Sequence, residues 1–209
     1  MNFLKNCLLK VIVQVSFVLL AGGCLSVPDS PNPRFYMLQP QGQDQLTQKF
    51  DIPSEVIIGI GPVEIPEYLN RPQIVTFNKD STVRFSEFDR WAESLDFLLA
   101  GVVRANLSLM LSGAKFEIYP WNAVMPVKYQ VMLEVVQLNA HLDNELVFVV
   151  QWSIFDIKNK RIVLIKRSEF RQEINPHNYS TLVEKLSFEC GILSSQIAEA
   201  IAGLEIKKD

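Results

Sequence analysis

The sequence predicts an α+β fold in which two long amphipathic helices pack on one face of a mostly antiparallel β-sheet. Two segments, near residues 90–111 and 178–203, repeat apolar residues at steps of three and four, which is the period of an α-helix. Between them lie three long strand-like segments that are joined by short turns, and short connections favour antiparallel neighbours. This order of strands, helix, strands and helix is typical of helices segregated to one face of a sheet.

The first part of the predicted domain, 34–209, contains short strands. Gly59 and Gly61 interrupt the second of them and indicate a bulge or a close backbone approach there. The two strands that follow are separated by Asn-Lys-Asp-Ser, so we expect them to form a hairpin. The four predicted strands are 34–39, 55–65, 73–77 and 82–85.

The first long helix is predicted over Arg90–Leu111, with Asp89 as its N-cap and a stop at Ser112-Gly113. A short strand over 115–119 follows. The apolar stripe of this helix consists of Trp91, Leu95, Leu98, Leu99, Val102, Val103, Leu107 and Met110.

Three long strands and a second helix complete the domain. The strands are predicted over 127–138, 145–157 and 161–173, and the helix over 178–203. Thr181 and Glu184 have the spacing of a capping box at the start of this helix. Cys190 lies on the apolar stripe of the same helix, which predicts a buried and inert thiol.

The N-terminus has the anatomy of a secretory signal peptide. Lys5 and Lys10 provide positive charge, Val11 to Leu20 form an apolar run, and the small residues Ala21-Gly22-Gly23 precede Cys24. The apolar run is shorter than the roughly 20 residues that span a bilayer, so a cleaved signal over residues 1–23 is favoured over a permanent transmembrane helix.

The sequence Leu20-Ala21-Gly22-Gly23-Cys24 resembles the lipobox of bacterial lipoproteins, although Ala21 stands where Leu is usual. This resemblance implies that the thiol of Cys24 receives a diacylglyceryl group and that the new amino terminus is acylated after cleavage. Leu25 rather than Asp follows Cys24, which in lipoprotein sorting implies the outer membrane, facing the periplasm. An ordinary secretory signal with a chance cysteine is the alternative.

Residues 24–33 are expected to be a lipidated tether, because three prolines with Ser, Asp and Asn prevent regular structure. Nine such residues reach at most about 30 Å, which keeps the domain close to the membrane. Cleavage removes two of the 20 basic residues and none of the 23 acidic ones, so the net charge falls from −3 to −5. This acidic balance, with no basic patch, argues against nucleic acid as a partner.

The sequence favours no enzyme class and no cofactor. It contains no nucleophile elbow, phosphate-binding loop, dinucleotide fingerprint or zinc-protease motif. His141 and His177, the only histidines, lie in predicted turns without Cys or carboxylate at ligand spacing, so we expect no metal site. A hydrolase whose carboxylates converge only in the fold stays open as an alternative.

Two segments look more specific than the rest. The first, Glu64 to Val75 (EIPEYLNRPQIV), places Tyr68 and Arg71 on a loop between prolines, and Tyr and Arg are typical interface anchors. Two interpretations stay open: Tyr68 and Leu69 plug the end of the core, or Tyr68 and Arg71 form a partner or self-interface. The second segment is Phe88 to Glu93 (FDRWAE), in which Trp91 is expected to be a core residue.

These segments, together with Tyr119-Pro120-Trp121 and the closing helix, resemble the ABC-type transport auxiliary lipoprotein family, in particular its paraquat-inducible Pqi branch. The resemblance covers nearly all of the chain after the signal. It implies an accessory, non-catalytic role in intermembrane lipid transport, at the outer membrane, docking the tunnel of an MCE-domain transport protein. It also implies a homo-oligomer. An assembly or pilot lipoprotein for an outer-membrane complex is the alternative.

Overall fold

The computed structural model describes residues 31–42 and 48–206. The predicted signal peptide, Cys24 and most of the tether lie outside these residues. A compact unit begins at Pro33. Its elements are β1 (Arg34–Tyr36), β2 (Phe50–Asp51), β3 (Ile57–Glu64), η3 (Glu67–Leu69), β4 (Gln73–Phe77), β5 (Val83–Trp91), α2 (Leu95–Met110), β6 (Leu111–Ser112), β7 (Lys115–Ile118), β8 (Tyr129–Ala140), β9 (Glu145–Asp156), β10 (Arg161–Glu173) and α3 (Tyr179–Ile206).

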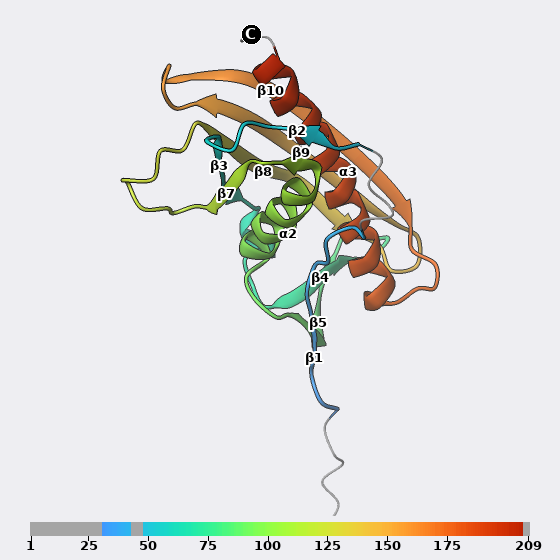
Figure 1. The fold of residues 1–209 in the computed structure, drawn as a ribbon. Helices are drawn as coiled ribbons and strands as arrows, with labels where there is room; N and C mark the ends of the chain where they lie inside the picture. Colours follow the sequence, from blue (N-terminus) through green and yellow to red (C-terminus); the bar gives the residue numbers. More distant parts are fainter. Residues whose placement is uncertain (1–30, 43–47, 207–209) are drawn as a thin grey trace, which may run out of the picture. The chain divides into compact units, whose positions relative to one another are not determined.

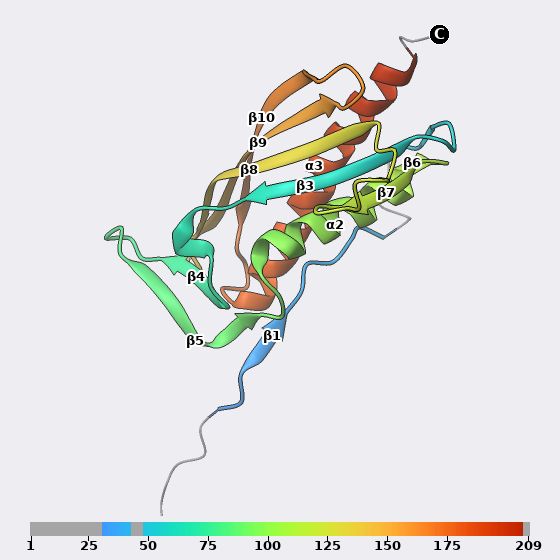
Figure 2. The same cartoon turned by 90° about the vertical axis from the view of Figure 1, so that its left-hand side faces the viewer.

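The main sheet has five strands in the order β10-β9-β8-β3-β7, and α2 and α3 pack together on one face of it (Figure 1). A second, three-stranded sheet has the order β1-β5-β4, and β2 pairs with β6. Figure 2 shows β1, β4 and β5 together at one end of the domain. The fold is thus α+β with two long helices, as the sequence predicts.

The prediction of a mostly antiparallel sheet is only partly right. β8, β9 and β10 form the expected antiparallel meander, but β3 runs parallel to both of its neighbours, β7 and β8. Parallel neighbours require a crossover connection, and here the segment with β4, β5 and α2 is that crossover. β1 also pairs in parallel with β5, and β2 with β6.

The glycines of β3 confirm the predicted irregularity. The register against β8 shifts between Ile60 and Val63, and Gly61 adopts φ +106°, a conformation that L-residues avoid. Gly59 lies under the ring of Trp121, where a Cβ would be only 2.5 Å from ring atoms. The Trp121 ring can therefore approach the backbone of β3 closely because residue 59 has no side chain.

The first helix begins later than predicted. Residues through Trp91 belong to β5, and α2 begins at Leu95 with Ser94 as its N-cap. Asp89 is therefore a strand residue, and the prediction that it caps the helix is wrong. The reason is that Trp91 and Ala92 donate their backbone N–H groups to Pro72 and Tyr36, which keeps this segment extended. The expected stripe from Leu95 to Met110 is buried.

The last helix, α3, is capped by Asn178, whose Oδ1 accepts the N–H of Thr181 at 2.9 Å. The prediction of Thr181 as the capping residue of a capping box is therefore wrong by three residues. The other end is tied to β8 by Glu205, whose carboxylate accepts from Lys128 Nζ and from the Tyr129 hydroxyl, each at 2.6 Å. Cys190 is fully buried, as predicted, and burial raises the pKa of its thiol.

Candidate functional site

The loop that carries the sequence EIPEYLNRP forms a single 3-10 turn, η3, at the end of the core. Leu69 is 3 % exposed and plugs the core, while Tyr68 packs edge-on against Phe77 with 5.8 Å between ring centroids. Burial raises the pKa of the Tyr68 hydroxyl. Tyr68 is thus half-buried and packs against Phe77 at the end of the core.

Arg71 has a different position from Tyr68. Its guanidinium carbon lies 3.9 Å above the centroid of the Phe85 ring, which is a cation–π contact between the loop and β5. Phe85 is 46 % exposed, so this stacked pair lies at the surface. The Nε atom of Arg71 is buried and has no hydrogen-bond partner among the described residues.

The two specific segments of the sequence meet at this place. The backbone N–H of Trp91 donates to the carbonyl of Pro72 at 2.7 Å, and Trp91 itself is 5 % exposed and part of the core. Around this contact lies a pocket of about 370 Å³, which we call the motif pocket. It is lined by Asn70, Arg71, Pro72, Trp91, Ala92, Glu93 and Ser94.

Asp89 is a site residue that the sequence analysis misassigned. It is 4 % exposed and lies at the centre of a polar cluster that joins β1 to β5. Its carboxylate accepts hydrogen bonds from the Tyr36 hydroxyl at 2.8 Å and the Ser86 hydroxyl at 2.9 Å, and it forms an ion pair with Arg34 at 2.8 Å. No local signal in the sequence indicates this cluster, because Tyr36 and Asp89 are 53 residues apart.

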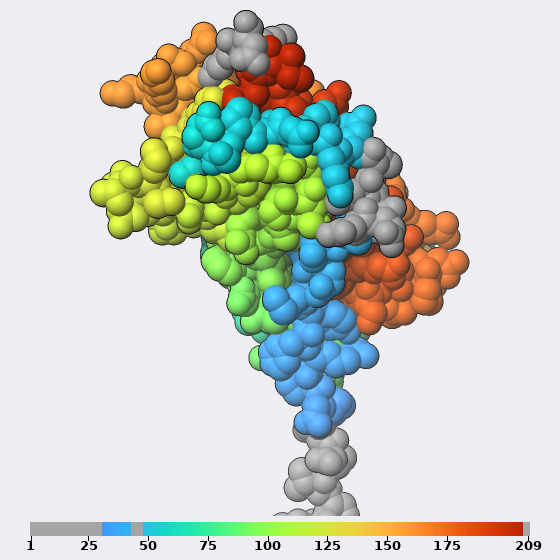
Figure 3. Space-filling model, viewed as in Figure 1, coloured from blue at the N-terminus to red at the C-terminus, as the bar shows by residue number. Residues whose placement is uncertain are grey.

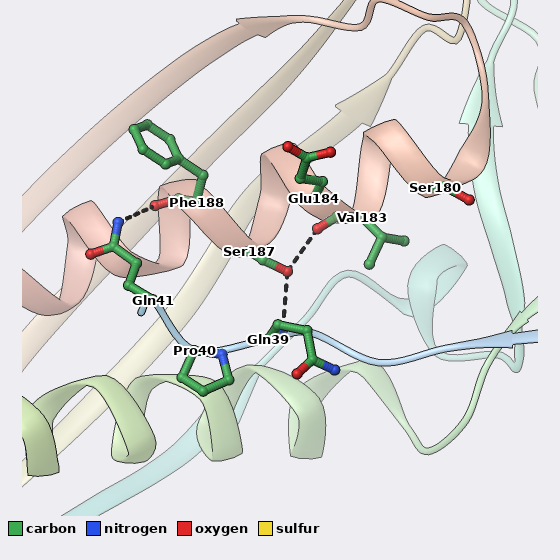
Figure 4. A pocket seen from close by; sticks show the side chains of 8 residues that line it. All are labelled: Gln39, Pro40, Gln41, Ser180, Val183, Glu184, Ser187 and Phe188. Atoms are coloured by element: carbon green, nitrogen blue, oxygen red, sulfur yellow. Dashed lines mark hydrogen bonds between the residues drawn. The ribbon is translucent and has the colours of Figure 1, made fainter. Parts of the chain in front are cut away.

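A segment after β1, Leu38–Gln41, crosses the helix pair, and we call it the helix strap. In Figure 3 it lies between α2 and α3. Gln39 donates its backbone N–H to Ser187 at 3.1 Å, and Gln41 donates to Asn106 Oδ1 at 2.8 Å (the α3 side is drawn in Figure 4). Asn106 is a polar residue on the apolar side of α2. Its side chain is fully buried and accepts the hydrogen bond from the Gln41 backbone.

Two open hollows flank the helix strap. The one beside α3 is about 340 Å³ in volume and is lined by Gln39, Pro40, Gln41, Ser180, Val183, Glu184, Ser187 and Phe188 (Figure 4). The one beside α2 is about 320 Å³ and includes Met37 and Phe97, which are both about half exposed. The charged side chains in these linings are Glu184 beside α3, and Glu93 and Arg104 beside α2.

Acidic side chains and histidines of the described residues are a further feature of interest for chemistry. Among residues 31–42 and 48–206, no three His, Cys, Asp or Glu side chains are placed to hold a metal ion. Two carboxylates, Glu64 and Glu134, lie opposite each other on β3 and β8 and line a shallow pocket of about 140 Å³ on the outer face of the sheet. His141 contacts Phe77 at 6.0 Å between ring centroids.

A sequence model of the ABC-type transport auxiliary lipoprotein component family matches residues 36–198. The chain belongs to this family. The matched range contains the whole motif pocket, Asp89 and both helices up to Ala198 of α3. No curated protein matches the chain.

Solved structures support the fold of this auxiliary lipoprotein. An uncharacterised protein is 18 % identical and superposes with a TM-score of 0.66, over 82 % of this chain and 99 % of its own. A protein from Xanthomonas campestris is 7 % identical and superposes with a TM-score of 0.62, over 84 % of this chain and 100 % of its own. At these identities the similarity shows the fold alone.

Within the described residues of the auxiliary lipoprotein, neither helix is sufficiently long and apolar to cross a membrane.

Proposed function

We propose that this protein is a periplasmic lipoprotein anchored in the outer membrane and that it serves an MCE-type intermembrane lipid transport system as a non-enzymatic accessory subunit. It docks the tunnel of the transporter and binds no cofactor. The observation that carries the proposal is the match to the auxiliary lipoprotein family across both sequence segments that form the motif pocket.

The position of the anchor supports the outer-membrane part of the proposal. Cys24 follows the small residues of the lipobox and precedes Leu25, so the acylated protein passes to the outer membrane. The nine residues from Leu25 to Pro33 reach at most about 30 Å, which is too short to cross the periplasm. A partner must therefore span the gap, and an MCE tunnel is such a partner.

We also propose Arg71 and Tyr68 as residues of a contact face. Arg71 presents a guanidinium at the surface over the ring of Phe85, while Tyr68 packs behind it against Phe77. Arg71 makes the contact, and Tyr68 holds the η3 turn in place. Exposed Arg side chains next to aromatic rings are common energetic centres of interfaces.

The test is crosslinking in intact cells, followed by purification of the tagged lipoprotein and mass spectrometry. The proposal expects an MCE-domain protein among the crosslinked partners, and expects it to be lost when the same tagged chain carries Cys24→Ser and is no longer anchored. Recovery of only an outer-membrane secretin or barrel would replace the proposal by the assembly role. As a functional readout, deletion should weaken resistance to detergent once parallel transport systems are also removed.

A further inference from the structure

The outer face of the three-stranded sheet combines exposed rings with arginines. Phe35 on β1 is 63 % exposed and lies directly opposite Arg90 on β5, which in turn lies opposite Gln73 on β4. Residues opposite each other on paired strands point to the same side of a sheet. Phe35, Arg90 and Gln73 therefore form one row. Phe85 lies opposite Val75, two residues along β4 from Gln73, so the register shift between these pairs brings Phe85, under the Arg71 guanidinium, to the same side of the sheet. We call Phe35, Arg90, Gln73, Phe85 and Arg71 the β1 face.

Within the described part of the chain, the arginines of the β1 face have no anionic partner. Neither Arg71 nor Arg90 forms an ion pair among the described residues, and the Nε atom of each is buried without a hydrogen-bond partner. Asp89, the nearest buried carboxylate in sequence, points to the other side of β5, where Arg34 and Tyr36 hold it. The exposed Glu93 lines the adjacent motif pocket without pairing to either arginine.

The chain leads from this face directly to its anchor. Ten residues separate Phe35 from Cys24, and they reach at most about 35 Å when extended. Figure 2 shows that β1, β4 and β5 occupy one end of the domain, away from the ends of β9 and β10 that carry the meander turn. β1 is therefore the described strand that the fewest residues separate from Cys24.

We propose that the β1 face rests on the anionic phospholipid surface of the membrane in which the protein is anchored. Phe35 and Phe85 enter the headgroup region, and the guanidinium groups of Arg71 and Arg90 donate hydrogen bonds to lipid phosphates, whose geometry suits the planar arginine fork. Arginines near an anionic bilayer are attracted to it over about one Debye length, so the contact weakens as salt rises.

This inference rests on the proposed function, because it takes the membrane from the acylation of Cys24. It also deepens that function by naming the partner of Arg71. With the β1 face on the membrane, the opposite end of the domain, where the β9–β10 turn lies, faces the periplasm and is free to meet the transporter.

The test uses the full acylated chain in vesicles of phosphatidylcholine with or without phosphatidylglycerol. An environment-sensitive fluorophore is placed by Phe35→Cys, since Cys24 is acylated and Cys190 is fully buried. The matched control is Ile165→Cys on β10, which is 59 % exposed, against 63 % for Phe35, and faces away from the helices. We expect the Phe35 probe to shift to the blue and to be quenched severalfold less by iodide in phosphatidylglycerol vesicles, while the Ile165 probe stays aqueous.

Variants of the arginines identify the cause of the shielding. Arg71→Gln with Arg90→Gln should remove most of the shielding of the Phe35 probe, and added salt should do the same. Arg84→Gln is the control, because Arg84 is exposed on β5 but lies opposite Thr76 and so points to the other side of the sheet. An equal loss with Arg84→Gln would mean that general charge, and not the β1 face, mediates the contact.

The remaining outcomes overturn the proposal in distinguishable ways. An acylated, vesicle-bound chain whose Phe35 probe stays aqueous overturns the membrane contact and leaves the anchor intact. A chain without acylation at Cys24 overturns the anchor, and with it the membrane assignment of this face. If the Phe35 probe is instead shielded in detergent, without vesicles, and more so as the protein concentration rises, the β1 face is assigned to a second copy of the chain. If shielding requires an added transporter protein, the β1 face is assigned to that protein.

Discussion

Replacing Asp89 by Ala should loosen the strand that connects the domain to its anchor. Asp89 is 4 % exposed and holds β1 to β5 through the hydroxyl of Tyr36 and the guanidinium of Arg34. Its carboxylate also accepts from the hydroxyl of Ser86 within β5. β1 contains only three residues, so few other contacts replace this cluster. The loss should therefore be measurable both in global stability and in the local protection of β1.

The expected magnitude follows from the partners of the carboxylate. A hydrogen bond to a charged group contributes about 1.5 kcal/mol at the low end of its range, and Asp89 accepts two from buried or partly buried hydroxyls, which gives about 3 kcal/mol. The ion pair adds less than about 1 kcal/mol, because Arg34 is 67 % exposed and solvent screens it. For a domain of this size, about 3 kcal/mol corresponds to a Tm lower by roughly 6–12 °C.

Denaturant unfolding of the full chain measures this change, with two matched variants beside it. Tyr36→Phe removes one of the two hydroxyl bonds and should cost about half as much as Asp89→Ala, while Arg34→Gln should cost under about 1 kcal/mol. Limited proteolysis should cut after β1 faster in Asp89→Ala than in wild type. If Asp89→Ala and Arg34→Gln unfold at the same denaturant concentration, the reasoning that the buried hydroxyl bonds dominate is refuted.

Three further predictions concern the rest of the domain. Gly113→Ala should lower the free energy of unfolding by at least about 2 kcal/mol, as measured in denaturant. Gly113 has φ +90°, and an added Cβ would meet the Ile52 carbonyl. An unchanged free energy of unfolding would contradict that geometry. Asn106→Ala removes the acceptor of the Gln41 backbone N–H, so it should lower the free energy of unfolding by about 1 kcal/mol. It should also increase proteolytic cutting in the helix strap. Unchanged cutting would mean that the helix strap does not depend on this hydrogen bond. Burial raises the pKa of Glu189, so its carboxyl favours the folded state below its ordinary pKa of 4.5 and loses that contribution as the pH rises through the raised value. Glu189→Gln should therefore raise the Tm near neutral pH, with a difference that shrinks toward acid; a difference independent of pH would point to packing instead.

The candidate site was only partly visible in the sequence. The sequence indicates both segments that form the motif pocket: Tyr68 and Arg71 lie on a loop between prolines, and Trp91 lies in the segment from Phe88 to Glu93. Whether Tyr68 plugs the core or makes contacts could not be decided from the same residues. Phe77 and Phe85, which hold Tyr68 and Arg71 respectively, lie on β4 and β5, and their distances depend on the hairpin.

The errors have a common physical origin. Asp89 precedes a helical stripe and has the side chain of an N-cap, yet long-range hydrogen bonds from Trp91 and Ala92 extend β5 past it. Thr181 and Glu184 have the spacing of a capping box, but Asn178 caps the helix in their place. In both cases a short local pattern fits more than one register, and contacts from distant parts of the chain select one of them.

By itself, the sequence determined the two helices, the antiparallel meander of β8 to β10, the buried thiol of Cys190 and the irregular β3. These features follow from periodicity and glycine placement, which act between residues close together in the chain. Only the tertiary structure decided that β3 runs parallel to β7 and β8, that Asp89 joins β1 to β5, and that Phe35, Arg90 and Arg71 share one face. Strand pairing is set by the burial of apolar surface across crossover connections, and no local pattern records which distant strand will be the neighbour.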